Sequence, residues 1–126
     1  MLTISILAAV AAFIHVLFFV FESILWTTPA VRKIFGQSEA DARTTKLLAL
    51  NQGYYNLFLA LGAAAGIYFW NVGHIQPAVA LLTLSLGSMV GASLVLLFSA
   101  GVKMLRGVLL QGLVPAVCLA LLWRLN

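Results

Sequence analysis

The chain has 126 residues, of which 63% are hydrophobic and only 8% are charged. Soluble domains have roughly 45–50% apolar and about 25% charged residues, so a soluble fold of this length could not hide so much apolar surface. The net charge of +4 does not indicate nucleic acid, because the basic residues lie at the ends of apolar stretches, where they face lipid headgroups. We therefore expect no nucleic-acid partner, the lipid bilayer as solvent, and a single integral membrane domain over residues 1–126.

Four apolar stretches match the length of about 20 residues that a helix needs to cross a hydrocarbon core of roughly 30 Å. Short turns at residues 71–76 and 100–101 enforce antiparallel neighbours. The sequence therefore predicts an all-α, polytopic membrane protein, a four-transmembrane-helix antiparallel bundle with helices at about residues 3–26, 45–70, 77–99 and 104–123.

The first of these helices carries two ionisable side chains, His15 and Glu22. Seven residues are close to two helical turns, so the two share one face, about 10 Å apart along the axis. Ala8 and Ala11 fall on the same face, and small residues let a neighbouring helix approach closely. Both ionisable groups are therefore expected to point into the bundle, where they are the candidates for proton transfer.

Residues 27–44 are expected to form a turn in the membrane interface. Thr28 is placed as the N-cap of a short helix, and Gly36 is placed to end it. A capping box starts at Ser38, so the second long helix begins there, outside the bilayer, and enters it around Leu47.

A polar cluster then interrupts the second long helix. Asn51, Gln52, Tyr55 and Asn56 lie in a segment that otherwise holds mainly apolar residues, and at roughly 100° per residue they cover one arc of the helix. Gln111 of the last helix is expected at a similar depth. An isolated polar side chain is expensive in a membrane, so we predict that these five residues form a ligand-binding site.

Helix depth suggests how the first two helices are aligned. At 1.5 Å per residue, Glu22 shares a level with Asn51, and His15 shares a deeper level with Asn56. Amide groups can donate to an ionised carboxylate or accept from a protonated one. We therefore expect Glu22 and the amides of Asn51 and Gln52 to share one hydrogen-bonded site.

Three functions remain open on these residues. The first is a pocket that binds, and in one version transforms, a small lipophilic molecule, with Glu22 or His15 exchanging a proton. The second is a proton- or solute-translocating carrier that uses the same two residues as a relay. The third is a scaffold whose polar residues only specify helix pairing; in that case Glu22 would form an ion pair with Lys103 or Arg106.

The sequence predicts no metal and no cofactor. Paired histidines or cysteines at metal-ligand spacing are lacking, as is a phosphate-binding loop. The alternative is a haem group bound through His15, and this single histidine is the residue on which that alternative rests.

Gly87 and Gly91 form a GxxxG pattern on the third long helix. Such a face lets two helices pack closely, either within one protomer or between two copies. We expect a homo-oligomer.

Lysine and arginine are distributed unevenly. Only Arg124 belongs to the side of the termini, and the others flank the two connections of the opposite side: Arg32, Lys33, Arg43, Lys46, Lys103 and Arg106. The positive-inside rule then places both termini outside the cytoplasm.

Several segments together resemble the small bacterial membrane proteins grouped as domain-of-unknown-function family 1304. The most specific are a Trp-Thr-Thr-Pro turn and an Asn-Gln-Gly-x-Tyr-Asn segment, and the set comprises His15, Glu22, Trp26–Pro29, Phe35–Gly36, Asn51–Ala60, Gln111–Gly112 and Pro115–Ala116. The resemblance covers essentially the whole chain. It implies a four-helix, multi-pass protein of the bacterial inner (cytoplasmic) membrane, and it implies no activity.

Overall fold

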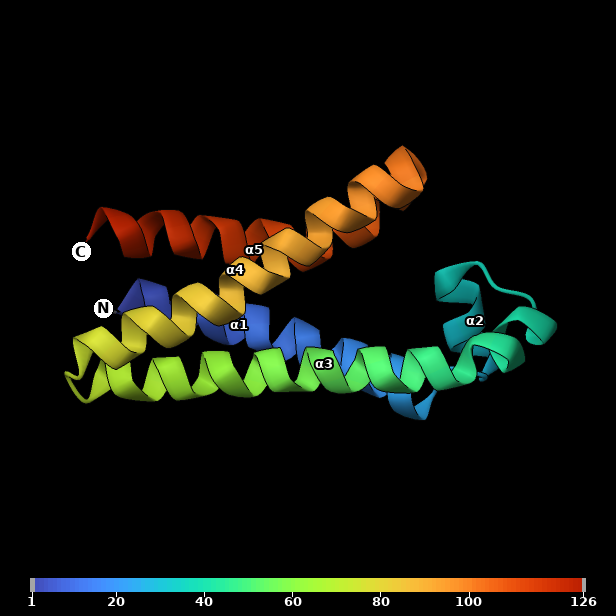
Figure 1. Ribbon diagram of the computed structural model, residues 1–126, viewed down its shortest axis with the longest axis horizontal. Coiled ribbons are helices and arrows are strands. Elements are labelled where there is room, and N and C mark those ends of the chain that lie inside the picture. Colours follow the sequence, from blue (N-terminus) through green and yellow to red (C-terminus); the bar gives the residue numbers. More distant parts are fainter. Residues whose placement is uncertain (1, 126) are drawn as a thin grey trace. The chain divides into compact units, whose positions relative to one another are not determined.

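The computed structural model describes residues 2–125. Within them all regular structure is helical (Figure 1), which confirms the all-α prediction. In chain order the elements are α1 (Leu2–Phe19), a π-helical segment (Val20–Ile24), α2 (Pro29–Phe35), α3 (Glu39–Asn71), α4 (Ile75–Ala100), a 3-10 helix (Gly101–Met104) and α5 (Leu105–Arg124).

Two segments of the described chain are long and apolar enough to cross a membrane, Leu2–Ile24 and Ile75–Arg124. The second has 50 residues and includes both α4 and α5, so it is long enough for two crossings of about 20 residues each. Helix α3 is not part of either segment; its Asn51–Asn56 stretch places polar side chains in the middle of the helix. The four-span bundle therefore stays a prediction.

The chain folds as two compact units. The apolar unit comprises α1 up to Ile14 together with the chain from Leu59 onward, and the polar unit runs from His15 to Phe58.

The apolar unit has a hydrocarbon core in which small residues bring the helices close. Its largest fully buried side chains include those of Ile4, Leu82, Leu86, Met89 and Leu122. A Cβ built on Gly66 of α3 would lie 2.7 Å from the Cγ of Leu82 on α4. Glycine at this position therefore lets α3 and α4 approach more closely than a side chain would.

Helices α4 and α5 lie side by side and antiparallel within this unit (Figure 1). The Nε1 of Trp123, near the end of α5, donates a hydrogen bond of 3.1 Å to the Oγ1 of Thr83 in the first half of α4. The glycine-led turn at Gly101, whose φ of 70° lies in the left-handed region, reverses the chain between them.

The two glycines of the GxxxG pattern, Gly87 and Gly91, have unexpectedly open surroundings. A Cβ added to Gly87 or to Gly91 would have no atom within 4 Å, so neither glycine is a point of close helix contact within the apolar unit. Packing of this face against another part of the protomer and packing against a second copy both stay predictions.

In the polar unit, the capping predictions around α2 are confirmed. The Oγ1 of Thr28 accepts from the backbone N–H of Val31 at 3.5 Å, and Gly36 ends α2 in the left-handed conformation with φ of 64°. The N–H of Gln37 then donates to the carbonyl of Arg32 at 2.9 Å, the long bond of a Schellman motif. These local signals make α2 a short helix that reverses toward the start of α3 (Figure 1).

The start of α3 is also capped as expected. The Oγ of Ser38 accepts from the backbone N–H of Asp41 at 3.1 Å and donates to the Asp41 carboxylate at 2.6 Å. Helix α3 then runs unbroken for 33 residues from Glu39. The expected interfacial connection at residues 27–44 therefore consists largely of helix, because the N-cap at Ser38 starts α3 well before its apolar part begins.

Candidate ligand site

The candidate site is built on a π-helical turn at the end of the first helix. Regular α-helix was expected to about residue 26, but it ends at Phe19 and is followed by the π-helical segment Val20–Ile24. The backbone N–H of Leu25 donates to the carbonyl of Val20 at 3.0 Å, five residues earlier. Such turns are rare, and they occur frequently at functional sites. Glu22 lies in the middle of this one.

Glu22 is held by an amide from α3. The Nδ2 of Asn56 donates to the Oε2 of Glu22 at 2.7 Å. Asn56 is only 3% exposed, whereas Glu22 is partly exposed. An ionised carboxylate has two oxygens and about four acceptor positions. The bond from Asn56 therefore fixes the carboxyl group and leaves it able to accept from a second donor.

Ser23 fixes the spacing between the π turn and α3. Its Oγ donates to the carbonyl of Leu50 at 2.9 Å. A Cβ built on Gly53 would collide with this hydroxyl and would lie 3.0 Å from the Ser23 backbone nitrogen. Gly53 is thus required for the close approach of the two segments, in the middle of the predicted polar cluster.

Trp26 anchors the other side of the π turn. Its Nε1 donates to the Oγ1 of Thr45 at 3.1 Å, and its ring packs against Phe35 of α2 with centroids 5.0 Å apart. Val31 and Ala42 complete a small buried cluster around the indole. Helix α2 is therefore attached to the start of α3 through an apolar core with one internal hydrogen bond.

A pocket of about 350 Å³ opens between these elements. It combines one acid with two bases and an apolar wall, and its lining comprises Glu22, Ser23, Ile24, Trp26, Thr27, Arg43, Thr44, Lys46, Leu47 and Leu50. We call it the Glu22 pocket. Arg43 also pairs with Glu39, whose Oε1 accepts from its Nη2 at 2.6 Å.

A second cavity, of about 600 Å³, lies along α3. It is mainly apolar and is lined by Leu47, Leu48, Leu50, Asn51, Tyr54 and Phe58. We call it the α3 groove. Leu47 and Leu50 line both cavities, so the groove continues directly from the Glu22 pocket.

The structure separates the predicted site residues into three groups. Glu22 and Asn56 are in contact, whereas Asn51, Gln52 and Tyr55 are exposed on α3. The amide that reaches Glu22 is therefore that of Asn56 and not that of Asn51 or Gln52. The depth argument counted residues from assumed membrane boundaries, whereas the level of Glu22 along α3 is set by the close contact of Ser23 with Leu50 and Gly53.

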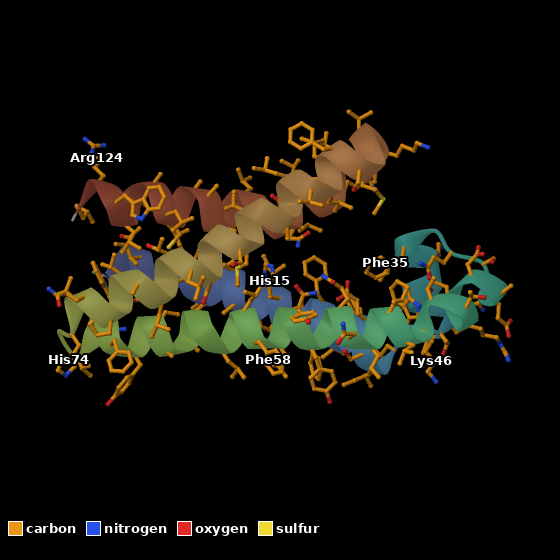
Figure 2. The ribbon with its side chains drawn as sticks, viewed as in Figure 1. His15, Phe35, Lys46, Phe58, His74 and Arg124 are labelled. Atoms are coloured by element: carbon orange, nitrogen blue, oxygen red, sulfur yellow. The ribbon has the colours of Figure 1, made fainter. Side chains whose placement is uncertain are left out.

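His15 and Gln111 lie elsewhere. His15 is fully buried in α1 (Figure 2), and its ring meets the edge of Phe18 with centroids 5.7 Å apart. Gln111 is half-buried in α5, in the apolar unit. Across residues 2–125, no group of three or more His, Cys, Asp and Glu side chains is arranged to hold a metal ion.

Of the ten residues that line the Glu22 pocket, only Glu22 was predicted as a site residue. Arg43 and Lys46 were used only as indicators of orientation, although their helical spacing from Leu47 and Leu50 places them on the same side of α3. The roles of Ser23 and Trp26 could not be predicted from the sequence, because they depend on backbone groups and hydroxyls of a distant segment.

Fold and composition define a small all-helical protein with two segments long and apolar enough to cross a membrane. The chain belongs to the family described as Protein of unknown function (DUF1304), whose family model matches residues 9–123. Neither the curated proteins nor the solved structures contain a match to it.

Proposed function

We propose that this protein is an integral membrane protein that binds a small lipophilic molecule with a polar head in the Glu22 pocket. The observation that carries the proposal is the composition of that pocket: a carboxyl group held by Asn56, two cations and an apolar wall surround one cavity of about 350 Å³. Ligand sites commonly combine a largely apolar lining with a few well-placed polar groups.

The membrane placement rests on length and charge. Leu2–Ile24 and Ile75–Arg124 have the length and apolarity of membrane spans. Helix α3, with 33 residues, is about 50 Å long, whereas the hydrocarbon core is roughly 30 Å thick. Its charged first turns would therefore extend into the headgroup region, with the Glu22 pocket at the boundary between headgroups and hydrocarbon.

The proposed orientation follows the basic residues. Lysine and arginine are concentrated between the first and second long helices and between α4 and α5, which is typical of the cytoplasmic side. The pocket then faces the cytoplasmic half of the membrane, and both termini lie outside the cytoplasm. A reporter that is active only in the cytoplasm, fused after Asn126, should remain inactive; activity would reverse the orientation.

The pocket chemistry suits reversible binding. The Asn56 amide can donate to an ionised Glu22, and its carbonyl can accept from a protonated one. The site therefore accommodates either protonation state, so that a ligand bearing a donor or an acceptor can be exchanged without leaving a polar group unpaired.

The test is to extract the protein from its native membrane in mild detergent and to identify co-purified molecules by mass spectrometry. We expect a lipophilic molecule with wild-type protein and with Asp41→Asn, which removes an exposed acid of the same unit outside the pocket lining, and its loss with Glu22→Gln. Equal retention by all three proteins, or no retained molecule with folded wild type, would contradict the proposal. A proton leak in liposomes that requires Glu22 would support the carrier instead.

A further inference from the structure

We propose that the ligand of the Glu22 pocket is a zwitterionic phospholipid: its ammonium group meets Glu22, its phosphate meets Lys46 and Arg43, and one acyl chain lies in the α3 groove. This inference rests on the proposed function, because it names the chemical class of the molecule that the same pocket would bind. Three features carry it: the two signs of charge in one pocket, the free donors of the cations, and the continuity of pocket and groove.

The charges of the pocket select a head that carries both signs. A carboxylate at Glu22 attracts an ammonium group and repels an anionic head. Lys46 and Arg43 attract a phosphate and repel a head that is only cationic. A head with an ammonium group and a phosphate can pair with the acid and with the two bases of the pocket at the same time.

The cations retain donors for a phosphate. Arg43 uses its Nε and Nη2 on the Oε1 of Glu39, at 3.1 and 2.6 Å. A guanidinium group has five N–H donors in all, so three remain. Lys46 is exposed at the pocket edge and has three ammonium donors.

The carboxyl group of Glu22 likewise retains free hydrogen-bonding positions, which an ammonium donor can use. Asn56 donates to Oε2, which fixes the direction of the carboxylate and leaves acceptor positions for a second N–H donor. The fixed direction lowers the ordering cost of binding, since the side chain does not have to be immobilised by the ligand.

The α3 groove supplies the place for an acyl chain. It begins at Leu47 and Leu50, which also line the pocket, and it ends at Phe58. From Lys46 to Phe58 the helix rises about 18 Å, close to the depth of one leaflet in a core of roughly 30 Å. Figure 2 shows both side chains projecting from α3 along this course. The rings of Tyr54 and Phe58, 6.3 Å apart, provide an apolar surface at the deep end.

The experiment measures headgroup preference with the purified full-length protein in detergent. Phosphatidylethanolamine and phosphatidylglycerol with identical acyl chains compete for the protein, and native mass spectrometry reports the bound ratio. We expect the wild type to prefer phosphatidylethanolamine by about tenfold, and Glu22→Gln to lose this preference. Asp41→Asn, which removes an exposed acid outside the pocket lining, should keep it. Lys46→Gln should reduce retention of both lipids about threefold to tenfold.

A third arm separates a lipid from a soluble molecule. Glycerophosphoethanolamine carries the same ammonium and phosphate without acyl chains, and we expect it not to displace the lipid at equal concentration. Displacement of the lipid by glycerophosphoethanolamine would contradict the proposal that the natural ligand is a lipid. Phe58→Ala, at the far end of the groove from the charges, should weaken both lipids equally, and an unchanged affinity would overturn the acyl-chain placement.

The outcomes distinguish this inference from the proposed function. If both lipids bind equally to wild type, or if Glu22→Gln keeps the preference, the zwitterionic head is wrong while binding in the pocket stands. If neither lipid binds the folded wild type and none of the variants changes retention of the co-purified molecules, the proposed function itself fails. Glu22→Asp keeps the charge and serves as the second variant, which should retain the preference if Glu22→Gln does not fold.

Discussion

In the apolar unit, helices meet mainly through glycines and buried aliphatic side chains, whereas in the polar unit hydrogen bonds between side chains are added to a small apolar cluster. Gly66 brings α3 against Leu82 of α4. In the other unit, Glu22 meets Asn56 and Trp26 meets Thr45. The difference separates two tasks: close packing is the main contact between helices in the first unit, and the second is specified by donors and acceptors that a ligand can also use.

The largest effect is expected where the apolar unit is most crowded. Gly66→Val would place a Cβ 2.7 Å from Leu82 Cγ and 3.2 Å from its backbone nitrogen. Because the backbone cannot move aside cheaply, we expect a loss of about 3 kcal/mol in the free energy of unfolding, the upper end of the usual cost of overpacking. Thermal unfolding in detergent, followed by circular dichroism, measures it.

The matched control lies on the open face of α4. Gly87→Val makes the same chemical change where nothing lies within 4 Å of the new Cβ, so the stability of the protomer should change little. If this face meets a second copy, the same variant should lower the oligomer fraction in native-membrane crosslinking. Equal destabilisation by Gly66→Val and Gly87→Val would contradict the contrast between the two faces.

These glycine pairs show what a sequence can and cannot predict. Both pairs are spaced four residues apart in apolar helices, so the spacing predicts a close-packing face for each. Only the structure distinguishes the pair that is packed, Gly62 and Gly66, from the pair that is open, Gly87 and Gly91. The helix ends were easier to predict than these contacts, because Thr28 and Ser38 cap their helices through hydrogen bonds to residues only three positions away.

The candidate site was only partly predictable for a related reason. Polar residues inside apolar helices identified Glu22 and Asn56, but their pairing depends on the rotation of one helix against another. The π turn changes the direction in which Glu22 points, and no local sequence pattern predicts that turn. The tertiary bonds of Ser23 to Leu50 and of Trp26 to Thr45 are invisible to periodicity for the same reason.

A second, smaller effect is expected in the polar unit. Glu22→Ala or Asn56→Ala removes one partner of a partly buried bond and leaves the other group unsatisfied, at a cost of about 2 kcal/mol. Because the two groups contact each other, the double variant should cost less than the sum of the single variants. Asn51→Ala, an exposed amide on the same helix, is the control and should be neutral. Additive effects in the double-mutant cycle would show that the pair is not coupled.

Two tryptophans allow a still finer comparison between the units. Trp26 and Trp123 each donate to a threonine hydroxyl at 3.1 Å, but Trp26 is 9% exposed and Trp123 is 60% exposed. Trp26→Phe should cost about 1 kcal/mol, because it leaves the half-buried hydroxyl of Thr45 without its donor. Trp123→Phe should cost less. A larger loss of thermal stability from Trp123→Phe would indicate that its exposed surface is covered in the membrane.

The smallest effect concerns pH at the start of α3. Hydrogen bonding from Arg43, then the charge of Arg43 and that of Arg32, hold the pKa of Glu39 below its usual value of 4.5. A carboxyl group whose pKa is lowered by folding stabilises the folded state at higher pH, and this contribution disappears as the pH falls through the lowered pKa. Between neutral pH and 4.5 the ion pairs should therefore persist, and below that range they should be lost.

The expected result is a local loosening of the connection between α2 and α3 below pH 4.5, seen as faster amide exchange around Ser38 while the apolar unit stays unchanged. Glu39 is exposed, so the effect should be small and should shrink further as salt is added. Glu39→Gln should abolish the pH dependence there, and Arg43→Gln should shift its midpoint upward, because the largest cause of the lowered pKa is removed. Amide exchange that accelerates equally in both units on acidification would instead show that the acid response is global and does not arise from these ion pairs.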